Sequence, residues 1–425
     1  MTARRYGREA PIRILARLTL TTCLLGGQGL VFDARAGDAD QAVGDPAVKV
    51  AAAIDQLRGV HIETMSVAER TALGQRLDRA WDTLYDHPDA AKKAILAVLA
   101  AERDDGFLLV DLSHLLTTLD PKSLEAAAGG LSRADVTAHP SGTFHAASRM
   151  AAGRCGACLP AVIRILEIEN AHTQIAQHAL PIDPQLMLTF TLGQYGDDAI
   201  GPVSAKLASD NCVVRGNAAL ALGLLQPRSI PGEIRRIAAE DPCDQARRKA
   251  WTALGLLDDP QLAGSATARL ESSPKPSKDE RLGIVLGLAS SFSPAARKPL
   301  QALAADPEAD VASAAKEGLL GLEEMETKMA QVKMKRASGP SPKRTKVMRR
   351  IERAVKDGRI ELEGGAGDLL ATLTAADIPL LNRARAALLG RLSDECLYEY
   401  YPLTYAVRAL RSYLTQPGEP PPGRD

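Results

Sequence analysis

A Leu-Gly pair recurs along the middle of this chain at a nearly constant spacing. The three clearest copies are equally spaced, at Leu222-Gly223, Leu254-Gly255 and Leu286-Gly287. An earlier copy, Leu192-Gly193, and a weaker later one, Leu320-Gly321, continue the series at almost the same interval. A period of roughly 30 to 34 residues is typical of proteins built from stacked helical units. The spacing therefore predicts an internal repeat.

Each repeat unit is predicted to hold two helices. After the Leu-Gly pair comes a short turn, and then apolar residues at helical spacing, such as Ile234 and Ile237. The unit closes on an acidic turn at Asp210, Asp241 or Asp306. Neither helix can bury its apolar face alone, so consecutive units must stack. We expect the repeated glycine to end or tighten the first helix where a second helix crosses it closely.

Composition supports a helical fold for most of the 425 residues. Aromatic residues make up only 4% of the chain, and Ala and Leu dominate the 45% that is hydrophobic. These residues favour helix over strand. With the repeat, the sequence predicts an all-α protein, an α-solenoid of stacked helix pairs with helical caps.

The repeats resemble HEAT repeats, in the shorter form also found in the bilin lyases of phycobilisomes. The resemblance covers residues 145–323. It rests on Val214-Arg215 and Ala246-Arg247, on the small residues Ala218, Ala219 and Ala250, and on Asp turns that follow the repeated glycines at a nearly constant distance. It implies an armadillo-like α-solenoid. It implies little about activity, because the same repeat serves many unrelated scaffolds.

The flanks of the repeats are predicted to be helical with interruptions. In the N-terminal region Asp104-Asp105-Gly106 separates two strong helices, the first with Ile95 and Leu99 on one face. The predicted parts are a signal peptide (1–36), an N-terminal helical region of degenerate repeats (37–144), the HEAT-like repeats (145–323), a basic flexible linker (324–346), a C-terminal helical cap (347–416) and a disordered tail (417–425). Five tyrosines in the C-terminal cap either close a core or form a binding face.

The leader, residues 1–36, is predicted to be an export signal. Five arginines precede the apolar run "LTLTTCLLGGQGLVF", and Ala34-Arg35-Ala36 fits a cleavage site. The run is too short and too glycine-rich to span a bilayer. The alternative is a lipoprotein modified at Cys23, but Thr22 and the apolar run after Cys23 argue against it. We therefore expect a periplasmic or extracellular protein.

The charge balance argues against nucleic acid as a general partner. Removing the six basic and two acidic residues of the leader leaves 46 basic and 50 acidic residues, a formal net charge of −4. A local exception lies between residues 328 and 359, with twelve basic and two acidic residues. This segment is either a solvated linker or a contact with an anionic membrane surface. The residues that would make that contact are Lys343, Arg344, Lys346, Arg349 and Arg350.

Five cysteines remain after the leader, and an exported protein can form disulfides. Cys155 and Cys158 allow a local disulfide, free or cross-paired thiols, or a redox or metal role. Cys212 and Cys243 occupy near-equivalent turns of consecutive repeats. Because stacked helices lie about 10 Å apart and a disulfide needs Cα atoms within about 7 Å, a bridge between them requires the turns to lean together. Cys396 is expected to stay unpaired.

The sequence contains no pattern that fixes an enzymatic activity. All seven histidines lie at or before His178, without metal-ligand spacing, and we interpret them as surface or capping residues. There is no Gly-x-Ser-x-Gly elbow, phosphate-binding loop or dinucleotide motif. We expect no cofactor and no metal, and an enzyme remains the less supported class.

The functional hypothesis is a scaffold that presents a rigid, curved surface to an unknown protein partner. The predicted contacts are Arg215, Arg247 and Trp251, although Trp251 aligns with Ala219 and could belong to the core. The alternative is a lyase-like or thiol-redox accessory enzyme on the same solenoid, with Cys155 and Cys158 as its reactive site.

Overall fold

The computed structural model describes residues 45–59, 67–169, 191–225, 227, 232–291, 293–337, 347–349 and 351–353, with five further positions between 373 and 384. All regular secondary structure in these residues is helical, and none of them forms a strand, which confirms the all-α class. The chain divides into two compact units, whose described parts begin at residues 45 and 191. The leader, the C-terminal tyrosines and Cys396 lie outside the described residues.

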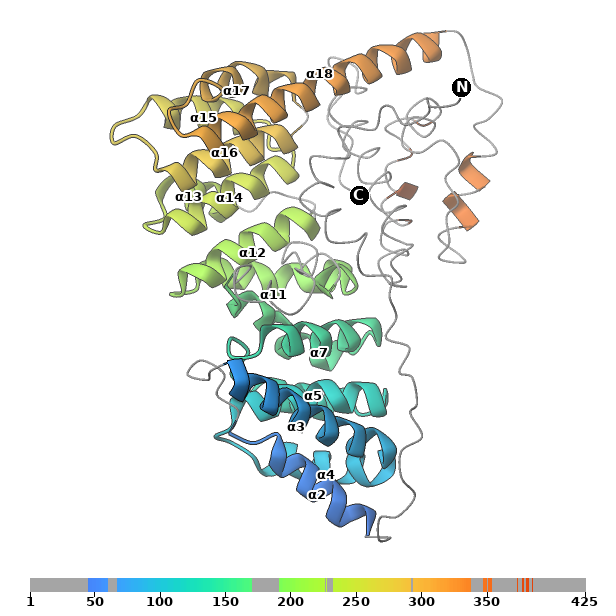
Figure 1. Cartoon of the computed structure of the whole chain (residues 1–425). Coiled ribbons are helices and arrows are strands. Elements are labelled where there is room, and N and C mark those ends of the chain that lie inside the picture. The colour runs from blue at the N-terminus through green and yellow to red at the C-terminus, as the bar shows by residue number, and fades with distance from the viewer. Residues whose placement is uncertain are drawn as a thin grey trace, which may run out of the picture. The chain divides into compact units, whose positions relative to one another are not determined.

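The N-terminal unit packs around one apolar helix. Its elements are α2 (Pro46–Gln56), α3 (Val67–Asp86), α4 (Pro88–Ala101), α5 (Gly106–Leu119), α6 (Leu124–Leu131), α7 (Pro140–Ala152), α8 (Leu159–Val162) and the 3-10 turns Gly156–Cys158 and Ile163–Glu167. Helix α5 contacts α4, α6 and α7 (Figure 1). The fully buried leucines of α5 explain its central place, since a helix apolar on most sides must be surrounded.

The ends of these helices follow from local sequence. Asp105 caps α5, its carboxylate accepting a hydrogen bond from the Leu108 N–H at 2.9 Å, so the predicted break between α4 and α5 is confirmed. Ile95 and Leu99 of α4 are buried, as their spacing predicts. Helix α7 ends at Ala152, and Arg154, two residues later, adopts a left-handed conformation with φ of 49°.

The C-terminal unit is a succession of paired helices. Its elements are α11 (Ile200–Ala205), α12 (Cys212–Leu225), α13 (Gly232–Glu240), α14 (Asp244–Leu256), α15 (Leu262–Glu271), α16 (Lys278–Ser290), α17 (Arg297–Leu303), α18 (Ala309–Ala337) and the 3-10 turns Gly196–Ala199, Lys206–Ala208 and Pro294–Ala296. Helices α12, α14, α16 and α18 pack each on the next, and α13, α15 and α17 pack against them (Figure 1). The predicted apolar residues of α13, Ile234 and Ile237, are fully buried.

The repeated glycines lie in the last turn of the first helices. A Cβ on Gly255 of α14 would lie 2.0 Å from the carbonyl oxygen of Gly287 in α16, and one on Gly223 would lie 2.9 Å from the Cα of Ala253. The close crossing expected at these glycines is therefore present, but the neighbour is the first helix of the next repeat. Helix α14 ends at Leu256, and Asp258, two residues later, adopts a left-handed conformation with φ of 51°.

Helix α18 is longer than the repeat pattern predicts. It spans 29 residues and includes 324–337, a stretch that the sequence analysis placed in a flexible linker. Of the five basic residues expected at a membrane surface, Arg349 is described as helical and exposed, and Lys343, Arg344, Lys346 and Arg350 lie outside the described residues. Within the part of the chain that is described, no helix is long and apolar enough to cross a membrane.

Candidate functional site

Arg215, one of the three predicted partner contacts, joins two consecutive repeats. Its Nε and Nη2 donate to the two carboxylate oxygens of Asp241 at 2.7 and 2.8 Å, and its Nη1 donates to the carbonyl oxygen of Ser209 at 2.8 Å. Burial works to raise the pKa of Asp241, but the hydrogen bonds from Arg215 and the Cys243 N–H outweigh it and hold that pKa below its ordinary value. The turn before α14 is thereby attached to α12.

Arg247 occupies the same place one repeat later. It donates to the carbonyl oxygen of Asp241, pairs with Asp244, and donates from Nε to the Glu280 carboxylate at 3.0 Å. Arg269 of α15 donates to both oxygens of the same carboxylate, at 2.7 and 2.9 Å. Glu280 is completely buried between the two guanidinium groups. We name Glu280, Arg247 and Arg269 the Glu280 triad. Their contacts attach α14 and α15 to α16.

The side chains of the predicted contact residues therefore make their contacts within the unit, and little of their surface reaches solvent. The side chains of Arg215 and Arg247 are each 14% exposed, and Trp251 is 2% exposed. A guanidinium bonded on three sides has little surface left for a partner. Trp251 lies in the core, which was the other interpretation of its alignment with Ala219.

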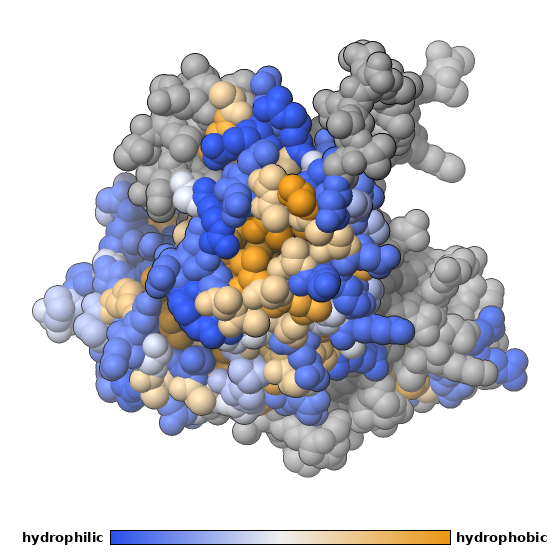
Figure 2. Space-filling view, turned by 90° about the horizontal axis from the view of Figure 1, so that it is seen from below, coloured by the Kyte–Doolittle hydropathy of each residue, from blue (hydrophilic) through white to orange (hydrophobic). Residues whose placement is uncertain are grey.

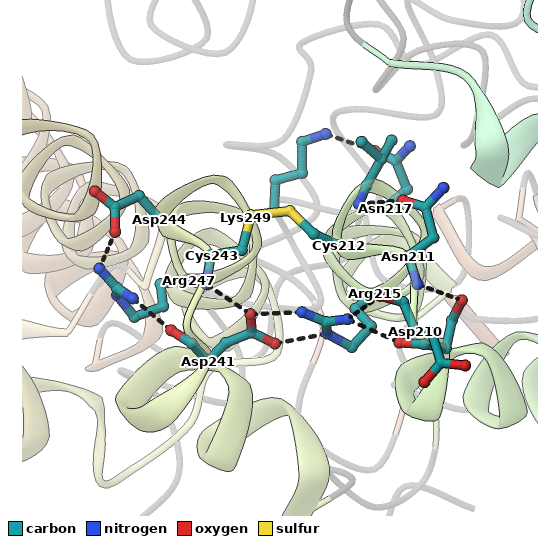
Figure 3. The surroundings of a disulfide bond; sticks show 12 residues. Asp210, Asn211, Cys212, Arg215, Asn217, Asp241, Cys243, Asp244, Arg247 and Lys249 are labelled. Atoms are coloured by element: carbon teal, nitrogen blue, oxygen red, sulfur yellow. Dashed lines mark hydrogen bonds and ion pairs between the residues drawn. A yellow bond between two sulfur atoms is a disulfide. The ribbon is translucent and has the colours of Figure 1, made fainter.

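Both predicted cysteine pairs lie at disulfide distance. Cys212 and Cys243 have their Cα atoms 6.2 Å apart, so the turns of consecutive repeats do lean together. Figure 3 shows the bridge with the Arg215–Asp241 pair on one side and Lys249 on the other. The buried Lys249 ammonium donates to the Asn217 side-chain oxygen at 2.7 Å.

The second pair forms a short local loop. Cys155 and Cys158 have Cα atoms 5.2 Å apart and close the segment between α7 and α8. Cys158 is fully buried and Cys155 partly so. The helix that follows has only four residues, so its dipole offers little activation of a thiol. The arrangement is that of a staple at the end of α7.

A cluster that the sequence analysis did not find lies in the N-terminal unit. Four rings from three helices follow one another, a set that we name the aromatic row: Tyr85 and Trp81 of α3, His114 of α5 and His145 of α7. Successive ring centroids are 6.2, 6.1 and 5.3 Å apart, and the two imidazoles stack within 21° of parallel. Tyr85 is 44% exposed and His145 is also exposed, so the row is open to solvent at both ends.

A second ring pair adjoins the row. His139, at the N-cap of α7, stacks on Phe107 with centroids 4.5 Å apart. Its Nδ1 lies 2.8 Å from Oδ1 of Asp111, a nearly buried carboxylate of α5. This contact brings the N-cap of α7 against α5.

The imidazoles of the row are held in their neutral form. Burial, followed by the charges of His145, Arg149 and His139, lowers the pKa of His114 to about 4. Although part of the His145 ring is exposed, removal of water from the rest, followed by the charges of Arg149 and His139, also lowers the pKa of His145. At neutral pH the row is therefore an uncharged aromatic surface with Arg149 beside it.

The row had a signal in the sequence. The intervals from Trp81 to His114 and from His114 to His145 are close to the period of the Leu-Gly repeat. The interpretation of the histidines as surface or capping residues holds for His139, at the N-cap of α7, and for the exposed His145. It is wrong for His114, which lies between the rings of Trp81 and His145. It missed the row because this region has a single Leu-Gly pair, Leu73-Gly74, and one pair does not mark a period.

An apolar surface lies elsewhere on the molecule. Figure 2 shows an apolar area framed by hydrophilic residues, on the face seen from below. Val48 of α2 is 65% exposed. A cavity of about 400 Å³ near this helix is lined by Arg58, Ala97, Val98, Ala101, Glu102, Arg103 and Asp104. Two of its lining residues, Arg58 and Glu102, form an ion pair with each other.

Comparison of the chain with protein-family models, curated proteins and solved structures gave no match. Among the described residues, no three His, Cys, Asp or Glu side chains are grouped so that they could hold a metal ion. The geometry of the two units is thus the basis for any functional proposal.

Proposed function

We propose that this chain is an exported scaffold of HEAT-like repeats, stacked as a solenoid, that binds a protein partner through the aromatic row of its N-terminal unit. The observation that carries the proposal is the row itself. It offers Tyr85 and Trp81 of α3, residue types that dominate the binding energy of protein interfaces, beside imidazoles from α5 and α7. Rigid helices keep the ordering cost of binding low.

Two features support the scaffold part of the proposal. The first helices of successive repeats pack on one another, and the Arg215–Asp241 pair and the Glu280 triad fix each to the next. These contacts hold neighbouring helices in place, so the surface that the helices form keeps its shape. The basic leader and the two cysteine pairs at disulfide distance support export into an oxidising compartment.

Proximity labelling in the producing cell tests this function. The full chain, with its own leader and a labelling enzyme fused to its C-terminus, should enrich one stable partner. The matched variant Tyr85→Ser, changed at an exposed side chain, should lose that partner while retaining its circular dichroism. If no stable partner is enriched, or if the Tyr85→Ser variant keeps it, the proposal is wrong.

The redox alternative has a direct test. A thiol-redox enzyme needs a reactive thiol, and Cys155 is the more accessible member of its pair. Alkylation under native conditions with a mild reductant should leave Cys155 unmodified if the pair is a staple. Rapid modification of Cys155 would favour the enzyme instead.

A further inference from the structure

The stacked imidazoles lie where three helices of the N-terminal unit meet. His114 of α5 has the indole of Trp81 on one side, at 6.1 Å, and the imidazole of His145 on the other, at 5.3 Å. The row thus joins α3, α5 and α7 through one central ring. A change at that ring acts on all three helices.

The charges around this ring make its protonation costly. From α7 and its N-cap, His114 faces His145, Arg149 and His139, all of which are cations or can become cations. From α3 it faces the neutral rings of Trp81 and, beyond it, Tyr85. The nearby carboxylate of α5, Asp111, faces His139 and not His114.

We propose that the aromatic row is an acid-operated switch, in which protonation of His114 and His145 charges two stacked rings beside Arg149 and separates α7 from α5 and α3. Two like charges at this distance repel each other strongly wherever water is partly excluded. Separation of the rings restores their hydration. The row is then lost as a continuous surface.

The switch is a property of the row and does not need a partner. If the proposed function is correct, the switch also regulates it, because a partner that covers the row buries neutral imidazoles and binds more weakly as the pH falls. The experiment below uses no partner, so the switch and the proposed function can fail separately.

Tryptophan fluorescence follows the switch directly. The chain has two tryptophans, and the Trp251 indole N–H has no hydrogen-bond partner among the described residues, so Trp251→Phe removes no hydrogen bond there and leaves Trp81 as the single reporter. Imidazolium quenches a neighbouring indole. On titration of the full chain from about pH 7.5 to about pH 3.5, we expect Trp81 fluorescence to fall with a midpoint well below about 6.5, the ordinary pKa of histidine.

Histidine variants test whether His114 and His145 cause the transition, and amide hydrogen exchange tests whether the helices separate. Replacing His114 and His145 with Gln should abolish the transition, and His145→Gln alone, a change at an exposed side chain, should weaken it. His87→Gln, at the N-cap of α4, is the matched control and should leave the transition unchanged. Amide exchange in α3, α5 and α7 should accelerate in acid relative to α12 and α14.

Two outcomes would overturn the switch. One is a fluorescence transition that persists in the double Gln variant with the same midpoint. The other is unchanged exchange in α3, α5 and α7 across the transition, which would mean that the histidines titrate without separating the helices.

Discussion

Gly255 of α14 faces the backbone of Gly287 in α16 so closely that a Cβ would lie 2.0 Å from its carbonyl oxygen. Gly255→Ala must therefore separate the two helices or displace their backbones, and it should lower the free energy of unfolding of the C-terminal unit by at least about 2 kcal/mol. Urea unfolding followed by fluorescence in the Trp81→Phe chain, where Trp251 is the single tryptophan, measures this change.

The matched control for this prediction is Gly264→Ala in α15, where an added Cβ meets nothing within 4 Å. It should be neutral or stabilise by roughly 0.5–1 kcal/mol, since alanine favours helix over glycine. Equal effects of the two substitutions would contradict the close crossing of α14 and α16.

The Glu280 triad predicts a large difference between two adjacent carboxylates. Glu280→Ala leaves the guanidinium groups of Arg247 and Arg269 partly buried without their shared partner, and it should destabilise the unit by about 3–5 kcal/mol. Asp279→Ala removes only an exposed pair with Arg248 and should change stability by less than about 0.5 kcal/mol. Chemical denaturation of both variants, followed by Trp251 fluorescence, measures the difference. Similar midpoints would exclude the triad as the attachment between repeats.

The two cysteine pairs should differ in how much they contribute to the free energy of unfolding. The Cys212–Cys243 bridge joins positions with a sequence separation of 31, and Cys212→Ser should cost about 3–4 kcal/mol by loop-closure entropy. Cys155→Ser opens a loop of separation 3 and should cost about 2 kcal/mol. Non-reducing peptide mapping first establishes the pairs. Free thiols at Cys212 and Cys243 in the exported protein would refute the bridge.

The pKa of His114 predicts how stability depends on pH. Because its folded pKa of about 4 lies below the ordinary value near 6.5, the unfolded chain binds the proton more readily. Stability should thus be highest above about pH 6.5 and fall between about pH 6.5 and 4, by roughly 2 kcal/mol after allowance for partial exposure. The readout is the difference between the wild type and His114→Gln in urea unfolding at neutral and at acidic pH. Parallel losses in both proteins would show that His114 is not responsible.

Some of this architecture could be predicted from the sequence. Leu-rich helices, the break at Asp105 and the equivalent positions of Cys212 and Cys243 depend on local spacing, and the structure confirms the all-α class and both cysteine pairs at disulfide distance. The HEAT family and the solenoid stay proposals. The spacing of residues could not predict burial that depends on contact with a residue distant in the sequence.

Arg215 illustrates this limit. A charged residue in a repeat helix is normally exposed, so the sequence predicts that it contacts a partner. Its burial depends on Asp241, in the acidic turn that closes its repeat, which places both carboxylate oxygens against the guanidinium. His114 and His145 illustrate the reverse case, because residues that look scattered in sequence become a stack only when α5 and α7 pack.

Site-specific photo-crosslinking tests the central claim most directly, since it compares the aromatic row with the surface first predicted from the sequence. A crosslinker replaces either Tyr85, in the row, or Arg248, which is 41% exposed and adjacent to Arg247. In the producing cell, the proposal predicts a discrete crosslinked partner from position 85 and none from position 248. A partner captured from position 248 alone would contradict the proposal and would indicate that the contact surface lies on the repeat helices.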